Sequence, residues 1–201
     1  PEDEEISAAL GTIINGYTES YPEGTRLDFG AVAKGYACDE AYRILSETET
    51  DYAVISLSST TLMYGEKSNG EKFRAGVTNP ESGSGYMGII ETDAAFVSTS
   101  GGYERYFESG GKRYCHILDV STGKPVETDL VSVTVIVPAE TAGGGIMSDF
   151  LSTLIFTEGT ENLDKWLAYE DFEIVAADEN GKVYTDCEGF VLDKSSGFYY
   201  G

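Results

Sequence analysis

The chain has 201 residues, of which 35 are acidic and 13 are basic, so its formal net charge is −22. We therefore expect no binding of nucleic acid or anionic lipid through the folded body, because those ligands would be repelled. The hydrophobic fraction of 41% is typical of a folded globular protein, and the length fits one compact domain.

Counts of single residue types limit the chemistry further. The only histidine, His116, excludes zinc sites built from several histidines. The cysteines, Cys38, Cys115 and Cys187, are too few for a disulfide scaffold and allow at most one disulfide. There is no run of about 18 apolar residues, so we expect no membrane span, and residues 1–10 lack the pattern of a signal peptide. Any chemistry must use oxygen ligands or the one imidazole.

The predicted elements begin with a strand at residues 26–29, a Gly30 turn and a helix over 31–45, where alanines recur at helical spacing. Short alternating runs over 52–97 predict a meandering antiparallel sheet. Strands are expected at 112–118 and 130–138. A helix capped by Ser148 is expected over 149–156, with Gly159 just past its end, followed by a helix at 161–169 and two or three strands within 172–191. This order favours an α+β fold.

The first two candidate segments could hold a phosphate-containing ligand. The predicted helix after Asp28 carries Lys34 near its start, where free N–H groups and the helix dipole attract anions. The alternative is an ordinary turn with a solvated lysine. In the sequence TSGGYERYF at 99–107, backbone amides near Ser100 and Gly101 could approach a ligand closely. The alternative is a hairpin tip with Tyr103 and Phe107 in the core.

The other two candidate segments offer a base and a metal site. Strand alternation places His116 on the face opposite its two neighbours, before a turn that opens at Asp119 and closes at Gly123. The alternative is a structural histidine. Asp149 and Thr153 lie four residues apart on one predicted helix face, where their oxygens could hold Mg²⁺. The alternative is an acidic first turn that complements the helix dipole.

Taken in order, these segments resemble the ApbE family, the FAD:protein FMN transferases once labelled thiamine-biosynthesis lipoproteins. The resemblance rests on DFGAVAKGYA at 28–37, TSGGYERYF at 99–107, HILDVSTGKP at 116–125, VTV at 133–135 and SDFLST at 148–153. It implies an ApbE-like α+β fold with mostly antiparallel sheets and a few packed helices. It also implies an extracytoplasmic, membrane-tethered lipoprotein.

The resemblance also implies an activity and its residues. The activity is Mg²⁺-dependent transfer of FMN from FAD to a threonine or serine of an acceptor protein, with release of AMP. FAD binding falls to Asp28, Lys34, His116 and the amides near Ser100, and His116 could take the proton of the attacking hydroxyl. The metal ligands would be the Ala31 carbonyl, Asp149, Thr153 and the Ser152 carbonyl.

The chain departs from the family pattern in three places. The family's GG-[ND] turn reads Ser58-Ser59-Thr60, and the proline of DPxTG is Val120. We also expect residues 1–201 to be a single ApbE-like domain that lacks the family's N-terminal flavin-binding region. Two alternatives therefore remain open: an FAD diphosphatase that uses water as the nucleophile, and a non-catalytic flavin-binding or structural relative.

Overall fold

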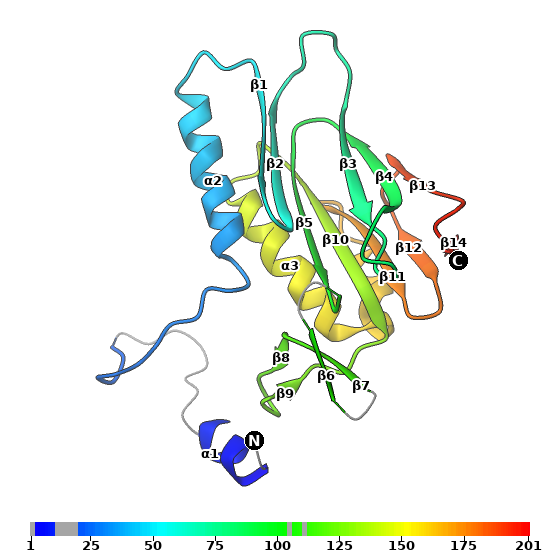
Figure 1. The fold of residues 1–201 in the computed structure, drawn as a ribbon. Helices are drawn as coiled ribbons and strands as arrows, with labels where there is room; N and C mark the ends of the chain where they lie inside the picture. Colours follow the sequence, from blue (N-terminus) through cyan, green and yellow to red (C-terminus); the bar gives the residue numbers. More distant parts are fainter. Residues whose placement is uncertain (1–2, 11–19, 104–105, 110–111) are drawn as a thin grey trace.

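The computed structural model describes residues 3–10, 20–103, 106–109 and 112–201. Its centre is a seven-stranded sheet in the order β1-β2-β5-β10-β11-β12-β14, in which only β12 and β14 pair in parallel (Figure 1). The strands are β1 (Tyr52–Leu57), β2 (Thr60–Gly65), β5 (Ala95–Gly101), β10 (Leu130–Pro138), β11 (Glu173–Asp178), β12 (Lys182–Thr185) and β14 (Tyr199–Tyr200).

Both faces of this sheet are covered. The helices α2 (Ala33–Ser46) and α3 (Gly144–Glu158) pack side by side on one face (Figure 1). A three-stranded sheet covers the other face; it contains β13 (Phe190–Leu192), β4 (Tyr86–Thr92) and β3 (Phe73–Thr78). This arrangement confirms the predicted α+β fold with mostly antiparallel sheets and a few packed helices.

The remaining elements are short. They are α1 (Asp3–Leu10), β6 (Tyr106–Ser109), β7 (Lys112–Cys115), β8 (Leu118–Asp119), β9 (Lys124–Pro125), a 3₁₀ turn at Thr160–Asn162, and α4 (Leu163–Trp166). Strand β6 pairs with β7, and β8 pairs with β9. No helix within the described ranges is long and apolar enough to cross a bilayer.

The core consists of two clusters, one on each face of the seven-stranded sheet. Successive residues of each strand point to opposite faces, so Phe96 packs toward the helices and Val97 toward the small sheet. On β10, Val135 and Ile136 divide in the same way. A strand buried on both faces reads as a continuous apolar run, which explains the sequence VTVIV in the middle of the sheet.

Several predicted elements are confirmed, with changes. The helix predicted over 31–45 is α2, the region 52–97 forms strands β1 to β5, and the tail forms β11 to β13. The strands of 52–97 divide between two sheets, because β3 and β4 pair with β13 while β1, β2 and β5 join the central sheet. The helix expected over 161–169 is reduced to the 3₁₀ turn and α4.

Three other predictions were wrong. Residues 26–29 form no strand and join none of the sheets. The strand expected at 112–118 ends at Cys115. Helix α3 begins at Gly144, before the predicted start, and Ser148 does not cap it, since its hydroxyl donates to the Gly145 carbonyl within the helix. The predicted end is confirmed, with Gly159 at the C-cap at φ +71°.

The turn between β1 and β2 contains Ser58, which has φ +61° and is the only non-glycine residue with positive φ in the described part of the chain. A β-carbon in this conformation costs about 1–2 kcal/mol. We expect Ser58→Gly to stabilise the fold by about 1 kcal/mol, a rise of about 2–4 °C in the unfolding temperature. The matched control is Ser59→Gly, which should lower that temperature slightly, and an equal rise in both variants would contradict the prediction.

Candidate functional site

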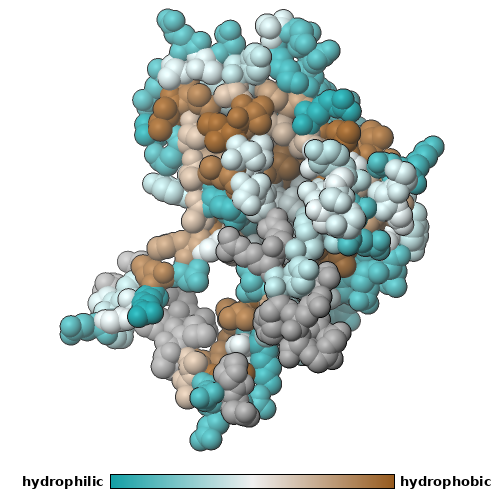
Figure 2. Space-filling model, viewed as in Figure 1, coloured by the Kyte–Doolittle hydropathy of each residue, from teal (hydrophilic) through white to brown (hydrophobic). Residues whose placement is uncertain are grey.

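An open cleft of about 2310 Å³ lies between the segment 21–34, the end of β5, the β8–β9 hairpin and α3. Figure 2 shows the surface hollowed beside the chain that leads into α2. Most of the predicted site residues line this cleft, although they come from distant parts of the chain. Those residues are Asp28, Ala31, Lys34, Ser100, His116 and Thr153.

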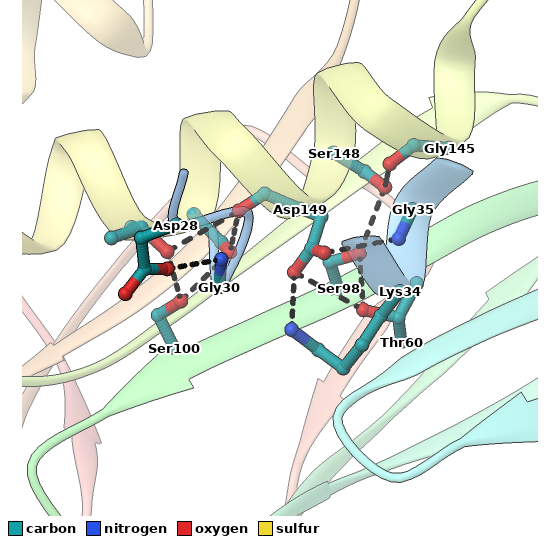
Figure 3. Close-up of polar contacts among 12 residues, drawn as sticks. Asp28, Gly30, Lys34, Gly35, Thr60, Ser98, Ser100, Gly145, Ser148 and Asp149 are labelled. Atoms are coloured by element: carbon teal, nitrogen blue, oxygen red, sulfur yellow. Dashed lines mark hydrogen bonds and ion pairs between the residues drawn. The ribbon is translucent and has the colours of Figure 1, made fainter. Parts of the chain in front are cut away.

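Asp149 lies behind the cleft wall, and its side chain is almost completely buried. Its Oδ1 atom lies 2.8 Å from the Lys34 Nζ atom, and its Oδ2 atom accepts a 3.0 Å hydrogen bond from the Gly35 N–H (Figure 3). Thr60 also donates to Oδ1, at 3.3 Å. A buried carboxylate needs such partners, because burial without them costs several kcal/mol. Asp149 therefore joins α3 to the start of α2.

A row of buried hydroxyl groups leads away from this carboxylate into the core (Figure 3). Thr60 donates to Asp149, Ser98 donates to Thr60 at 3.2 Å, and Ser98 and Ser148 share a 2.8 Å hydrogen bond. Donation from Ser98 to Thr60 and from Thr60 to Asp149 polarises these two hydroxyls toward the negative charge. Thr60 stands where the family's GG-[ND] turn has asparagine or aspartate. This departure from the family pattern provides the hydroxyl that donates to Asp149.

The predicted metal ligands on α3 make different contacts: the Thr153 and Ser152 hydroxyls meet the Asp149 backbone carbonyl, whereas the Asp149 carboxylate points toward α2 and β2. Thr153 donates to the Asp149 carbonyl oxygen at 3.3 Å, and Ser152 donates to the same oxygen at 2.9 Å. Both hydroxyls are within 3.0 Å of the Ser100 hydroxyl on β5. Ala31 lines the same cleft as Thr153. Within the described residues, no three His, Cys, Asp or Glu side chains are placed to hold a metal, and the predicted set contains only one carboxylate.

Asp28 and His116 lie on exposed parts of the cleft wall. The Asp28 carboxylate accepts a 2.7 Å hydrogen bond from the Gly30 N–H, which fixes the turn before α2 (Figure 3). His116 follows the end of β7 rather than lying on a strand, yet it is more exposed than Cys115 and Ile117, as the predicted alternation required. Lys34 and His116 therefore face one cleft.

The turn after His116 forms as predicted, although it lacks the family's proline. The Gly123 N–H donates to the Asp119 carbonyl at 2.7 Å, and Gly123 has φ +66°. The Asp119 carboxylate accepts hydrogen bonds from the Ser121 N–H and hydroxyl at 2.8 and 2.7 Å. The Ser121 hydroxyl is the main cause that lowers the pKa of the Asp119 carboxyl below its ordinary value. Side-chain hydrogen bonds thus replace the stiffness of proline.

Helices α2 and α3 cross with their backbones in close contact at Gly35 and Gly145. A Cβ atom on Gly35 would lie 2.2 Å from the Gly145 carbonyl oxygen, and one on Gly145 would lie 2.3 Å from the Gly35 carbonyl oxygen. The Asp39 carboxylate of α2 accepts from the Gly145 and Ile146 N–H groups at 2.8 and 3.0 Å. Each helix thus supplies the carboxylate that caps the other's N-terminus, with Asp149 capping α2.

Loss of the Asp39 cap should weaken α3. We expect Asp39→Ala to lower the free energy of unfolding by about 1–2 kcal/mol, because two N–H groups at the helix start lose their acceptor. The control is Glu40→Ala, which removes a neighbouring carboxylate paired only with exposed Arg43 and should change stability by less than about 1 kcal/mol. Chemical denaturation measures both, and equal losses would contradict the capping role.

All three cysteines are free in the structure. Cys38 is completely buried on α2, and burial is the main cause that raises the pKa of its thiol to about 11. Burial likewise raises the pKa of the Cys187 thiol to about 12. Burial thus favours the protonated form of both thiols near neutral pH, and it makes them poor nucleophiles.

Sequence reasoning missed Asp39, Thr60 and Gly145 as residues that support this site. One usable signal was Gly35, a glycine inside a helical pattern, which indicates close backbone approach. Of the predicted segment 99–107, Glu104 and Arg105 lie outside the described residues, as does the side chain of Phe107. The prediction that Phe107 packs in the core therefore stays a prediction.

Comparisons with known proteins identify the family. A model of the ApbE family matches residues 1–176. The chain is 37% identical over 139 residues to an FAD:protein FMN transferase of Klebsiella pneumoniae, covering 69% of this chain and 40% of the relative. It is 33% identical over 147 residues to the FAD:protein FMN transferase of Treponema pallidum, covering 69% and 39%. The chain thus spans about two fifths of the length of these curated relatives.

Solved structures share the fold. The ApbE protein of Thermotoga maritima superposes with a TM-score of 0.77 at 28% identity, covering 92% of this chain and 62% of that one. The apo flavinyl transferase ApbE of Pseudomonas stutzeri gives a TM-score of 0.70 at 29% identity, covering 96% and 58%. With the family model matched over most of its residues, the chain belongs to the ApbE family.

Proposed function

We propose that this chain carries the catalytic site of an Mg²⁺-dependent flavin transferase, which moves FMN from FAD onto a threonine or serine of a partner protein and releases AMP. The observation that carries the proposal is convergence. Lys34, His116 and Thr153 come from three distant segments of the chain, yet they line one cleft beside the buried Asp149. Two curated relatives that are 37% and 33% identical to this chain are named FAD:protein FMN transferases.

The residues around Asp149 fit a hard divalent cation. Mg²⁺ prefers oxygen ligands; Thr153 and Ala31 line the cleft and would offer a hydroxyl and a backbone carbonyl, and the buried Asp149 carboxylate behind the wall would supply the charge. Ser152 would add its carbonyl. When bound, the ion would offset negative charge on the diphosphate. Lys34 would serve the same purpose from the start of α2, and a chain of charge −22 needs both cations to hold a diphosphate.

The chemical step would be in-line displacement at the flavin-side phosphorus. The acceptor hydroxyl oxygen forms a bond to this phosphorus while the bond to the bridging oxygen breaks, and AMP leaves with that oxygen. His116 is exposed on the cleft wall, where it would take the proton that the hydroxyl loses. Asp28 and the backbone amides near Ser100 would position the rest of the FAD.

The test incubates the protein with FAD, Mg²⁺ and a threonine-containing acceptor peptide. Transfer gives fluorescent flavin on the peptide and one AMP for each flavin attached. Free FMN with AMP and an unlabelled peptide would instead establish an FAD diphosphatase. FAD binding without AMP release would favour the non-catalytic alternative, and both of the last two results would overturn the transferase proposal.

A further inference from the structure

We propose that Lys34 neutralises the buried Asp149 carboxylate only while no metal is bound, and that a divalent metal displaces the Lys34 ammonium group from it. The displaced ammonium group then binds the diphosphate of the nucleotide. The proposal rests on the proposed function, because it concerns the same metal and diphosphate. It assigns Lys34 two successive partners instead of one. The metal and the diphosphate should consequently bind cooperatively.

The two oxygens of Asp149 have unlike surroundings. Oδ2 accepts from the Gly35 N–H inside the helix pair, where nothing can replace the donor without moving α2. Oδ1 faces the Lys34 ammonium group at 2.8 Å, and Thr60 donates to it more weakly at 3.3 Å. Figure 3 shows Lys34 reaching this carboxylate. Oδ1 is therefore the oxygen that can exchange one cation for another.

A metal on Oδ1 would bring a second cation close to the Lys34 ammonium group. A Mg²⁺ ion binds oxygen at about 2.0–2.1 Å, so it would lie within a few ångströms of an ammonium group that stayed 2.8 Å from the same atom. One carboxylate charge cannot offset three positive charges in a buried setting. Repulsion between the two cations should therefore drive Lys34 away from Oδ1 when the metal binds.

Lys34 is able to leave. Its side chain is 32% exposed, compared with 3% for Asp149, and it lines the open cleft on a flexible four-carbon stem. Without a metal, the ammonium group neutralises a carboxylate that would otherwise be buried with hydrogen bonds alone. Once displaced into the cleft, it loses its 2.8 Å contact with the buried Asp149 carboxylate, and a bound diphosphate would supply a new anionic partner. Metal binding alone should therefore be weak, and linkage requires that each ligand strengthen the other equally.

The first experiment measures Mn²⁺ binding without nucleotide, from the electron paramagnetic resonance signal of free Mn²⁺. Lys34→Met should bind Mn²⁺ at least tenfold more tightly than the unaltered protein. Lys124→Met is the matched control, because Lys124 lines the same cleft but pairs with exposed Asp3. It loses the same charge and should change the affinity by less than about threefold. Equal effects of both variants, or weaker binding by Lys34→Met, would overturn the proposal.

A second experiment needs no variant and so does not depend on the folding of Lys34→Met. Lysines of the unaltered protein are acetylated briefly, and the extent at Lys34 is read by mass spectrometry. Saturating Mn²⁺ should raise acetylation at Lys34 several-fold, later addition of ADP should reverse the rise, and Lys165 should not change. An unchanged rate at Lys34 would overturn the proposal.

The outcomes separate this proposal from the proposed function. Metal exchange at Lys34 without any flavin transfer would support the exchange and overturn the transferase activity. Flavin transfer without any change in Lys34 acetylation on metal binding would support the transferase activity and overturn the exchange. Absence of Mn²⁺ binding in every protein, with or without ADP, would overturn both the exchange and the metal dependence.

Discussion

Replacing His116 with alanine should slow FMN transfer by on the order of a hundredfold or more, because a positioned general base contributes about 10²–10⁴ in rate. The unfolding temperature should change little, since the side chain is exposed and follows the end of β7. Stopped-time assays of flavin on the acceptor peptide measure the rate, and thermal unfolding measures stability.

The control is Val120→Ala, which shortens another exposed side chain in the same cleft. Its transfer rate should stay within a few-fold of the unaltered protein. Unchanged turnover in His116→Ala would assign the histidine a structural role. A large fall in the transfer rate of both variants would show that the shape of the cleft wall, and not the His116 imidazole in particular, is required for transfer.

Placing a methyl group where α2 and α3 cross should destabilise the fold strongly. A Cβ atom at Gly35 or Gly145 would lie within 2.3 Å of a backbone oxygen on the other helix, and backbone cannot move aside as a side chain can. We expect Gly35→Ala and Gly145→Ala each to cost about 3 kcal/mol, or about 6–12 °C in the unfolding temperature. In an uncrowded helix, the same change would stabilise by about 1 kcal/mol.

Two further variants sharpen this test. The double variant Gly35→Ala/Gly145→Ala should cost less than the sum of the single losses, because the helices separate only once. Gly102→Ala is the control, since a Cβ atom there would lie 3.7 Å from Phe156 and 3.8 Å from Cys115, which are ordinary contact distances. Stability gains in the single variants would show that the two backbones do not touch in solution.

The fold could be predicted to the extent that hydrophobic pattern decides it. Alternation over 52–97 correctly predicted antiparallel strands, and alanine spacing correctly predicted α2. The division of strands between two sheets was not predictable, because it depends on β13, a strand near the C-terminus that pairs with β4. Residues 26–29 have a strand-like sequence, but pairing requires a neighbouring edge that local pattern does not reveal.

The candidate site was predictable for a different reason. Its residues were recognised by the order of their motifs, whereas spacing alone favoured a structural role for most of them. The start of α3 was missed because Gly144 and Gly145 are poor helix formers and the capping carboxylate comes from Asp39 on the other helix. Rules for helix caps consider neighbouring residues, so a cap from 106 positions away escapes them.

The position of Asp149 makes folding and chemistry inseparable at one side chain. Its carboxylate holds the first turn of α2 and would also be the charge that binds the metal. A relative that had lost all catalytic ability would still be under pressure to keep this aspartate, because without it the helix pair would lose a cap and Lys34 its counter-ion. An intact aspartate here is therefore poor grounds for inferring that a homologue is active, and exposed His116, which no helix end requires, is the more informative residue.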